Sequence, residues 1–260
     1  MTIPALATPN WTRRRWLAIS GLLAAGLGAG AGGSSANAAG PKPAAAAKDA
    51  PSDHEPINVA VVLGFYNTLI DFAGPWEVLS SSRRFNVYSV SDTRAPVICD
   101  DGRSSDASQT PISGLTVIPD FTFDDAPQPR ITLVGGQGER DATQAQVNAR
   151  KYEWIRHAAQ KADLTASVCV GAFELGAAGL LNGHSATTNR NAYDRFEKTF
   201  PKVNLVRGVR FVESGAVSTA TGLTAGIDLA LRITERFCGH DVAQRMANYE
   251  EWTSTAWNIA

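Results

Sequence analysis

Cys169 stands between a strand-forming run and a helix-forming run, a position suited to a nucleophile. Residues 164–168 before it are Leu-Thr-Ala-Ser-Val, and small residues follow from Gly171 onward. This order predicts a sharp strand-to-helix turn that holds Sγ near the first unpaired N–H groups of the helix, where thiolate is favoured over thiol. The sequence therefore predicts a reactive thiol, with a buried structural cysteine as the alternative.

Asp71 is the carboxylate expected to work with this thiol. An ionised carboxylate beside Sγ would raise the pKa of the thiol and suppress the nucleophile. We therefore expect a neutral carboxyl group, kept protonated by its apolar neighbours Ile70 and Phe72, that donates a hydrogen bond to the thiolate and shares one proton with it. The alternatives are a helix cap or a solvated loop charge. Glu77 is a second candidate carboxylate, but its helical position is expected to face solvent.

Two glycines, Gly135 and Gly136, follow another apolar strand-forming run, residues 131–134. Glycine permits backbone conformations that point N–H groups into a site, and preorganised donors stabilise charge that develops on a substrate. The pair could thus contribute to an oxyanion-type hole. An ordinary tight turn is the alternative.

The elements that must position these groups alternate between strand and helix, which predicts a mostly parallel sheet covered on both faces. In such sheets ligands bind at the carboxyl ends of the strands, where Asp71, the glycine pair and Cys169 should meet. The first helix is expected to open at Gly74, with Pro75 in its first turn. Strands are expected at 57–63, 85–90, 131–134, 164–168 and 216–220, short strand pieces at 96–99, 110–112, 115–118 and 185–188, a hairpin at 213–215, and further helices at 148–162, 171–181, 191–200, 224–237 and 241–252.

The amino-terminal 38 residues have the pattern of an export signal. Arg13-Arg14-Arg15 precedes an apolar, glycine-rich stretch, and Ala36-Asn37-Ala38 is a small-x-small cleavage pattern. The paired arginines resemble a twin-arginine signal, although ordinary secretory signals also begin with positive charge. A transmembrane helix is disfavoured, because spanning needs about 20 predominantly apolar residues. We expect a periplasmic or secreted protein without a stable membrane anchor, a flexible linker over 39–56 and one domain over 57–260.

Composition narrows the possible partners and cofactors. The chain has 24 basic and 25 acidic residues, and the first 38 residues hold three arginines and no acid, so the processed chain is mildly acidic. Nothing indicates a nucleic-acid partner. The three cysteines and four histidines form no zinc-ligand spacing, so no metal is expected. Cys99 and Cys238 could pair in an oxidising compartment, but we prefer no disulfide, because sequence supplies no distance.

Five motifs in order resemble those of the DJ-1/PfpI superfamily, over about residues 57–252. Within it the isocyanide hydratase branch is most similar, together with the amino-terminal domains of some AraC-type (GlxA-like) regulators. The motifs are Leu69-Ile70-Asp71-Phe72-Ala73-Gly74-Pro75-Trp76-Glu77-Val78-Leu79, Val134-Gly135-Gly136-Gln137-Gly138, Ser167-Val168-Cys169-Val170-Gly171, residues 175–183 with Ala186-Thr187-Thr188, and residues 221–231.

The resemblance implies a flavodoxin-like three-layer α/β sandwich, also like class I glutamine amidotransferases, in a homodimer. It implies Cys169 as nucleophile, Asp71 as its carboxylic partner, and the N–H groups of Gly136 and Val170 as oxyanion-type donors. Gly135, Thr188 and Asn189 are expected to line the substrate pocket.

The chain departs from the branch at two positions. The isocyanide hydratase branch commonly carries Ala-Thr-Thr-His-Trp where this chain has Ala-Thr-Thr-Asn189-Arg190, and asparagine cannot act as a base near neutral pH. Val170 stands where that branch often has threonine. Histidine 184 is near in sequence, but a turn and a surface role are expected for it.

Three functions remain open. The first is a cofactor-free cysteine enzyme that adds water to a small electrophile, such as an isocyanide. The second is glyoxalase-like or deglycase-like chemistry on reactive carbonyl compounds. The third is an exported ligand-binding or redox-sensing module without turnover, since no helix-turn-helix follows Trp252.

Overall fold

The computed structural model describes residues 55–100, 114–138 and 144–259. The expected export signal, all but the last two residues of the expected linker, and the strand piece expected at 110–112 lie outside these ranges.

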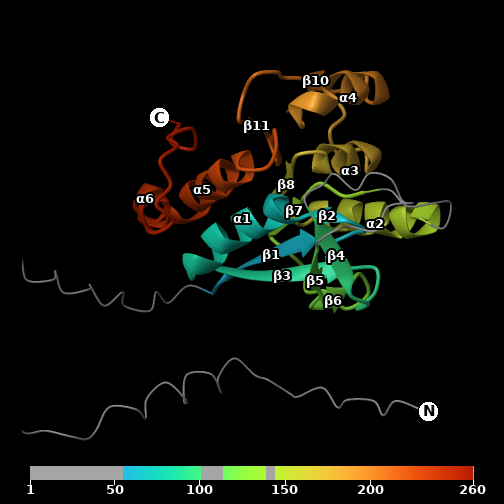
Figure 1. Ribbon diagram of the computed structural model, residues 1–260, viewed down its shortest axis with the longest axis horizontal. Helices are drawn as coiled ribbons and strands as arrows, with labels where there is room; N and C mark the ends of the chain where they lie inside the picture. Colours follow the sequence, from blue (N-terminus) through green and yellow to red (C-terminus); the bar gives the residue numbers. More distant parts are fainter. Residues whose placement is uncertain (1–54, 101–113, 139–143, 260) are drawn as a thin grey trace, which may run out of the picture. The chain divides into compact units, whose positions relative to one another are not determined.

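A seven-stranded sheet forms the centre of the protein, in the order β11-β12-β8-β7-β1-β3-β6 (Figure 1). All neighbouring strands are parallel except β11, which pairs antiparallel with β12. The strands are β1 (Ile57–Val62), β3 (Phe85–Ser91), β6 (Phe121–Thr122), β7 (Ile131–Val134), β8 (Leu164–Val168), β11 (Phe211–Ser214) and β12 (Val217–Ala220).

Helices cover both faces of this sheet, and the sequence alternation of β1 shows why. Val59 and Val61 pack into one apolar cluster with α1 (Leu69–Ser81), α5 (Ala225–Cys238) and α6 (His240–Tyr249). Ala60 and Val62 face the opposite cluster, with α2 (Gln144–Ala159), α3 (Gly171–Ala177) and α4 (Tyr193–Thr199). A strand buried on both faces needs apolar residues throughout. The fold is therefore the expected three-layer α/β sandwich.

Short strands outside the main sheet complete the loops. β2 (Asn67–Thr68), β4 (Val97–Asp100) and β5 (Leu115–Val117) form one small sheet, and β9 (Ser185–Ala186) pairs with β10 (Asn204–Leu205). The two-residue strands β2, β6 and β10 were not expected, because two residues carry no readable periodicity.

The prediction that the first helix opens at Gly74 is wrong. Helix α1 begins at Leu69 and contains Pro75 in its interior. Pro75 lacks the N–H that would bond to the carbonyl of residue 71, which disfavours a helix here. Packing against α5 compensates, since Gly74 and Pro75 lie so close to it that a Cβ on Gly226 would come within 3.2 Å of Pro75 Cγ. Asp71 therefore lies in the first turn of a helix and not in a loop.

Helix α3 is shorter than expected and ends at Ala177 instead of residue 181. Gly179 has φ of 78°, a left-handed conformation that an α-helix does not continue through. The helix expected at 191–200 is likewise divided, into a 3-10 turn (Arg190–Ala192) and α4.

Candidate active site

Cys169 occupies the strained turn that its sequence position predicts. It follows β8 directly and has φ of 61°, a left-handed conformation that non-glycine residues rarely adopt. Its N–H donates to Ala220 O at 3.1 Å, and Thr188 Oγ1 donates to its carbonyl at 2.9 Å. A neighbouring strand and a loop thus hold the strained turn from both sides.

The residue two positions after the cysteine must be glycine. A Cβ on Gly171 would lie 2.2 Å from the carbonyl oxygen of Val134, the last residue of β7. The start of α3 therefore lies directly against the end of β7, which brings Cys169 beside the glycine pair that follows that strand.

Asp71 is fully buried, and both of its carboxylate oxygens accept backbone hydrogen bonds. Gly136 N–H donates to Oδ2 at 3.0 Å, and Leu223 N–H donates to Oδ1 at 3.0 Å. Burial raises the pKa of Asp71 to about 6, while these two N–H groups and a hydrogen bond with Cys169 counteract part of the rise. The carboxyl group is therefore mainly ionised at pH 7.

The Cys169 thiol is 7% exposed, and its pKa is raised to about 12. Burial is the largest cause and the negative charge of Asp71 the second, while the Val170 N–H and the Asn189 amide act in the opposite direction. The expected proton distribution is thus reversed. At neutral pH the proton resides on sulfur and the carboxyl group is ionised, because burial raises the pKa of the thiol further while two backbone donors stabilise the carboxylate.

The two main-chain donors expected to face a substrate are engaged within the site. Gly136 N–H donates to Asp71, and the Val170 N–H is hydrogen-bonded to Cys169. In this structure the Gly136 N–H donates to the carboxylate, and its role as an oxyanion-type donor to a substrate stays a prediction. Both N–H groups instead stabilise negative charge on the carboxylate and on sulfur. Gly135 is needed for close approach, since a Cβ there would lie 3.1 Å from Asp71 Cβ.

Asn189 contacts the thiol directly. Its Nδ2 donates to Cys169 Sγ at 3.3 Å, and its Oδ1 accepts from Asn191 N–H at 2.9 Å, so the 3-10 turn fixes the direction of the amide. An asparagine so oriented offers sulfur a neutral donor. Thr188, the other expected pocket residue, is fully buried and supports the turn through the cysteine carbonyl.

Two further residues belong to the site, although their sequence pattern alone did not indicate a role. Leu223 has φ of 52° and directs its N–H to Asp71, and Gly222 lies so close to the cysteine that a Cβ there would be 3.4 Å from Sγ. Both lie between β12 and α5. A glycine two residues after a strand and shortly before a helix was the available signal, similar to the pair at residues 135–136.

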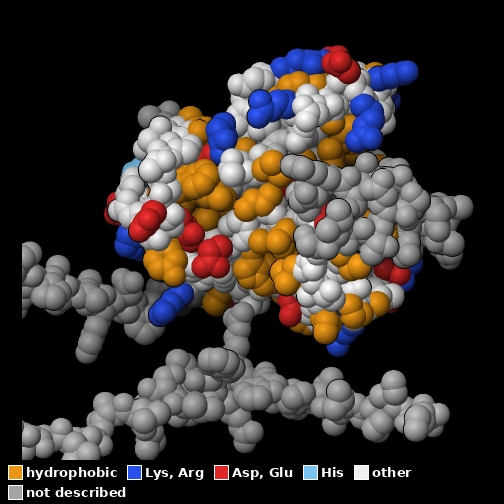
Figure 2. Space-filling model, viewed as in Figure 1, with side chains coloured by type: hydrophobic (Ala, Val, Ile, Leu, Met, Phe, Trp, Pro, Cys, Tyr) orange, Lys and Arg blue, Asp and Glu red, His pale blue; other side chains and the backbone are white. Residues whose placement is uncertain are grey.

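Exposed apolar side chains lie on the surface near the pair. Figure 2 shows hydrophobic side chains gathered over α1 and the adjacent end of α5. In this region Ile70 is 37% exposed and Leu223 is 44% exposed, and each is next in sequence to a residue of the site.

Other candidate residues lie away from Cys169 or face solvent. Glu77 is exposed, as expected, and accepts a hydrogen bond from Ser81. The ring of His184 contacts Ser214 Oγ at 3.1 Å. Cys99 and Cys238 are free thiols. Over residues 55–100, 114–138 and 144–259, no group of three His, Cys, Asp or Glu side chains could hold a metal ion.

The comparison with known families agrees with this geometry. Residues 57–236 match the model of the DJ-1/PfpI family. The chain belongs to that family. The match begins at the first residue of β1 and includes Asp71, Gly136 and Cys169.

Relatives in the DJ-1/PfpI family include both an enzyme and regulators. The isonitrile hydratase of Pseudomonas putida is 34% identical over 176 residues, which cover 67% of this chain and 69% of that protein. The transcriptional regulator GbdR of Pseudomonas aeruginosa is 26% identical over 195 residues, and the match covers 74% of this chain but only 50% of the regulator.

Solved structures of the DJ-1/PfpI family share the fold. A THiJ/PfpI family protein from Pseudomonas syringae superimposes with a TM-score of 0.64 at 25% identity, over 77% of this chain and 76% of that one. Oxidised DJ-1 of Toxoplasma gondii superimposes with a TM-score of 0.59 at 18% identity, over 76% of this chain and all of that one, which shows the fold alone.

Proposed function

We propose that this DJ-1/PfpI protein is a cofactor-free cysteine enzyme that adds water to a small electrophile, with an isocyanide as substrate and an N-substituted formamide as product. The observation that carries the proposal is the hydrogen-bonded pair of Cys169 and Asp71, in which a base and a thiol share one buried site. The 34% identity to an isonitrile hydratase supports the choice of substrate.

Asp71 acts as the base in this reaction. Its carboxylate takes the Cys169 proton as Sγ attacks the terminal carbon of the isocyanide, so free thiolate never has to accumulate. The carboxyl group then delivers that proton to the same carbon, which yields a thioimidate on sulfur. Water adds to the thioimidate carbon, the C–S bond breaks, and the formamide leaves while sulfur regains a proton.

Asn189 and the Val170 N–H position and stabilise sulfur during attack. Both donate toward Sγ, so the charge on sulfur as its proton leaves is met by donors already in place. This arrangement replaces the imidazole that is common at position 189 in the isocyanide hydratase branch.

The test is turnover of the purified protein with one alkyl and one aryl isocyanide, measured as formamide formed by chromatography. We expect Cys169→Ala to abolish formamide formation. Cys238→Ser is the matched control, because it removes a half-buried thiol elsewhere and should leave turnover unchanged. Formamide formation by Cys169→Ala at the rate of the wild-type protein would refute the proposal, as would the absence of turnover in the wild-type protein.

A binding module is the second candidate, favoured by the high thiol pKa and by the match to regulator domains. A protonated, 7% exposed thiol that contacts no histidine among the described residues suits ligand recognition as well as slow chemistry. If isocyanides and 2-oxoaldehydes are not consumed, this candidate predicts saturable ligand binding that persists in Cys169→Ala.

Export by a twin-arginine signal is proposed for the first 38 residues, which lie outside the described part of the chain. None of the helices in that described part is long and apolar enough to cross a membrane. Replacing Arg13, Arg14 and Arg15 with lysine should retain the protein in the cytoplasm, as measured by cell fractionation. Export that continues unchanged would refute the twin-arginine route.

A further inference from the structure

A cavity lies at the carboxyl ends of β1 and β3. Its volume is about 480 Å³, within the range of small-molecule sites. The residues that line it come from the segment after β1, from the end of β3 through β4, from Phe123 after β6 and from Lys151 of α2, and they include neither Cys169 nor Asp71. We call it the β1–β3 cavity.

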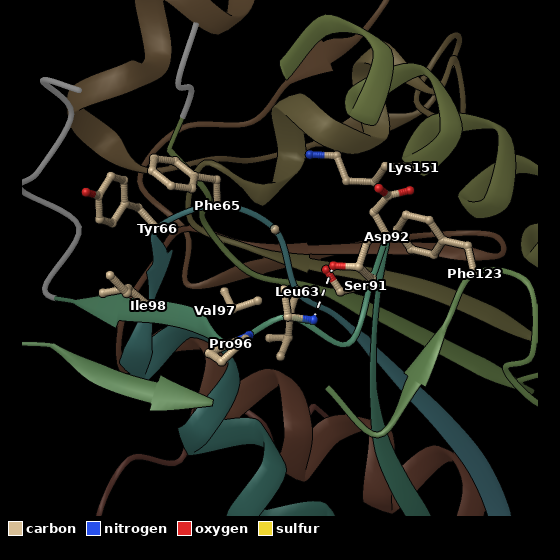
Figure 3. A pocket seen from close by; sticks show the side chains of 13 residues that line it. Leu63, Phe65, Tyr66, Ser91, Asp92, Pro96, Val97, Ile98, Phe123 and Lys151 are labelled. Atoms are coloured by element: carbon tan, nitrogen blue, oxygen red, sulfur yellow. Dashed lines mark hydrogen bonds between the residues drawn. The ribbon is translucent and has the colours of Figure 1, made fainter. Parts of the chain in front are cut away.

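The walls of the β1–β3 cavity are aromatic and apolar. Figure 3 shows the rings of Phe65 and Tyr66 on one side and the ring of Phe123 on the other, with Pro96 and Val97 between them at the base. Phe65 and Tyr66 are held edge to face with ring centroids 3.9 Å apart, and Phe123 is stacked on Trp154 at 5.5 Å. Each of these rings therefore packs against another aromatic ring.

The charged side chains of the cavity are already paired. Asp92 forms an ion pair with Arg150 at 2.6 Å, and Lys151 forms one with Glu174 at 2.6 Å. An ionic ligand would have to compete with these internal partners. A neutral ligand avoids that competition.

Lys151 nonetheless offers one hydrogen-bond donor. Its side chain is 4% exposed, and within the described part of the chain it has two oxygen partners, Glu174 Oε2 and Gln137 Oε1 at 2.8 Å. The Tyr152 ring is its other contact, with the centroid 5.3 Å from Nζ. An ammonium group carries three protons, so one N–H of Lys151 has no oxygen acceptor among the described residues.

We propose that the β1–β3 cavity is a second ligand site, which takes a small neutral molecule made of one aromatic ring and one hydrogen-bond acceptor. The ring packs between Phe123 and the pair Phe65 and Tyr66. The acceptor, a carbonyl oxygen or its equivalent, receives the remaining N–H of Lys151. This site is independent of the proposed chemistry at Cys169.

The test is calorimetric titration of the full chain with three probes. Acetophenone has the ring and the acceptor, cyclohexyl methyl ketone lacks the aromatic ring, and benzoate carries a negative charge. We expect saturable binding of acetophenone, with affinity several-fold weaker for cyclohexyl methyl ketone because the ring contacts are lost. Benzoate should also bind more weakly than acetophenone.

Variants locate the binding. Phe123→Leu should weaken acetophenone binding several-fold, whereas Phe200→Leu, a half-buried phenylalanine away from the cavity, should leave it unchanged. Lys151→Met combined with Glu174→Gln should weaken it about tenfold without leaving a buried charge unpaired. Thermal unfolding of each variant checks that it is folded.

Cys169→Ala distinguishes this site from the cysteine site and should bind acetophenone as the wild-type protein does. Three results would overturn the proposal: no saturable binding of acetophenone, equal or tighter binding of benzoate, or binding that is lost in Cys169→Ala and kept in folded Phe123→Leu.

Discussion

Cys169 and Cys238 lie at opposite ends of the α/β sandwich, and the charged side chains next to them have opposite signs. Cys169 lies at the carboxyl end of β8 beside the Asp71 carboxylate, whereas Cys238 ends α5 near the guanidinium of Arg84. Burial raises the pKa of both thiols, but Asp71 raises that of Cys169 further and Arg84 lowers that of Cys238. A positive neighbour favours the thiolate form of a cysteine. A carboxylate neighbour favours the thiol form and also supplies a base that can accept its proton. This difference supports the proposal that Asp71 takes the proton of Cys169 during the reaction.

Removing each thiol in turn should give the largest difference in turnover between the Cys169 site and the Cys238 site. Cys169→Ala should lower the rate of formamide formation at least about a thousandfold, because the nucleophile is gone. Cys238→Ser should keep the rate within about twofold, because no substrate contact is assigned to it. Single-substrate kinetics of both variants measure this contrast, and equal losses would remove the distinction drawn here.

Asp71→Asn should separate base catalysis from thiol ionisation. We expect turnover to fall about 10²-fold to 10⁴-fold because the base is lost. The pKa of the Cys169 thiol should fall at the same time, because the negative charge that raises it is removed. The rate of alkylation by iodoacetamide as a function of pH measures that pKa. A thiol pKa that rises in this variant would contradict the arrangement.

The pH dependence of folding stability should report the burial of Asp71. Its pKa is about 6 in the folded protein and about 3.8 when unfolded, so the unfolded chain loses this proton first as the pH rises. The carboxyl group therefore lowers the free energy of unfolding between about pH 4 and 6, by about 3 kcal/mol in total. Urea unfolding of the wild-type protein and Asp71→Asn across this range should show the difference, and parallel curves would contradict it.

The pH profile of kcat/KM should fall on the acid side because the same carboxyl group becomes protonated. Below about pH 6 Asp71 becomes protonated and can no longer accept the thiol proton, so kcat/KM should fall about tenfold per pH unit. This fall should be absent from the residual activity of Asp71→Asn. A wild-type profile that is flat from pH 5 to 8 would assign the base to another group.

Asn189→Leu should have the smallest effect on activity. It removes one of the two groups that donate to sulfur, so turnover should fall about tenfold while the Val170 N–H remains. Asn189→Asp should reduce turnover further and raise the thiol pKa, because it adds a second negative charge near Sγ. Steady-state kinetics of both variants, with Asn191→Ala as the control, test this order.

The elements were largely predictable because β1, β7 and β8 are short runs buried on both faces, which have a clear apolar pattern. The start of α1 was not predictable from local rules. Pro75 favours a helix start at residue 74, and only the packing of Gly74 and Pro75 against α5 explains a helix that begins at Leu69. Local propensity was overridden by contacts with a segment about 150 residues later in the chain.

The candidate site likewise has features that the sequence predicts and features that only long-range contacts decide. The types and positions of Cys169, Asp71 and the glycine pair followed from the sequence, because a strand-to-helix turn and a tight approach require particular residues. The hydrogen-bond partner of each atom did not follow from the sequence. Leu223 reaches Asp71 from 152 positions away, and its N–H helps to make the carboxyl group the stronger acid of the pair.

The sequence by itself determined the family, the layered α/β fold and the identity of the candidate nucleophile, because these depend on periodicity and on residue types at fixed spacing. Only the tertiary structure decided where the proton resides and which main-chain donors remain open. Those properties depend on burial and on distances of about 3 Å between segments far apart in the chain, and no local pattern encodes them.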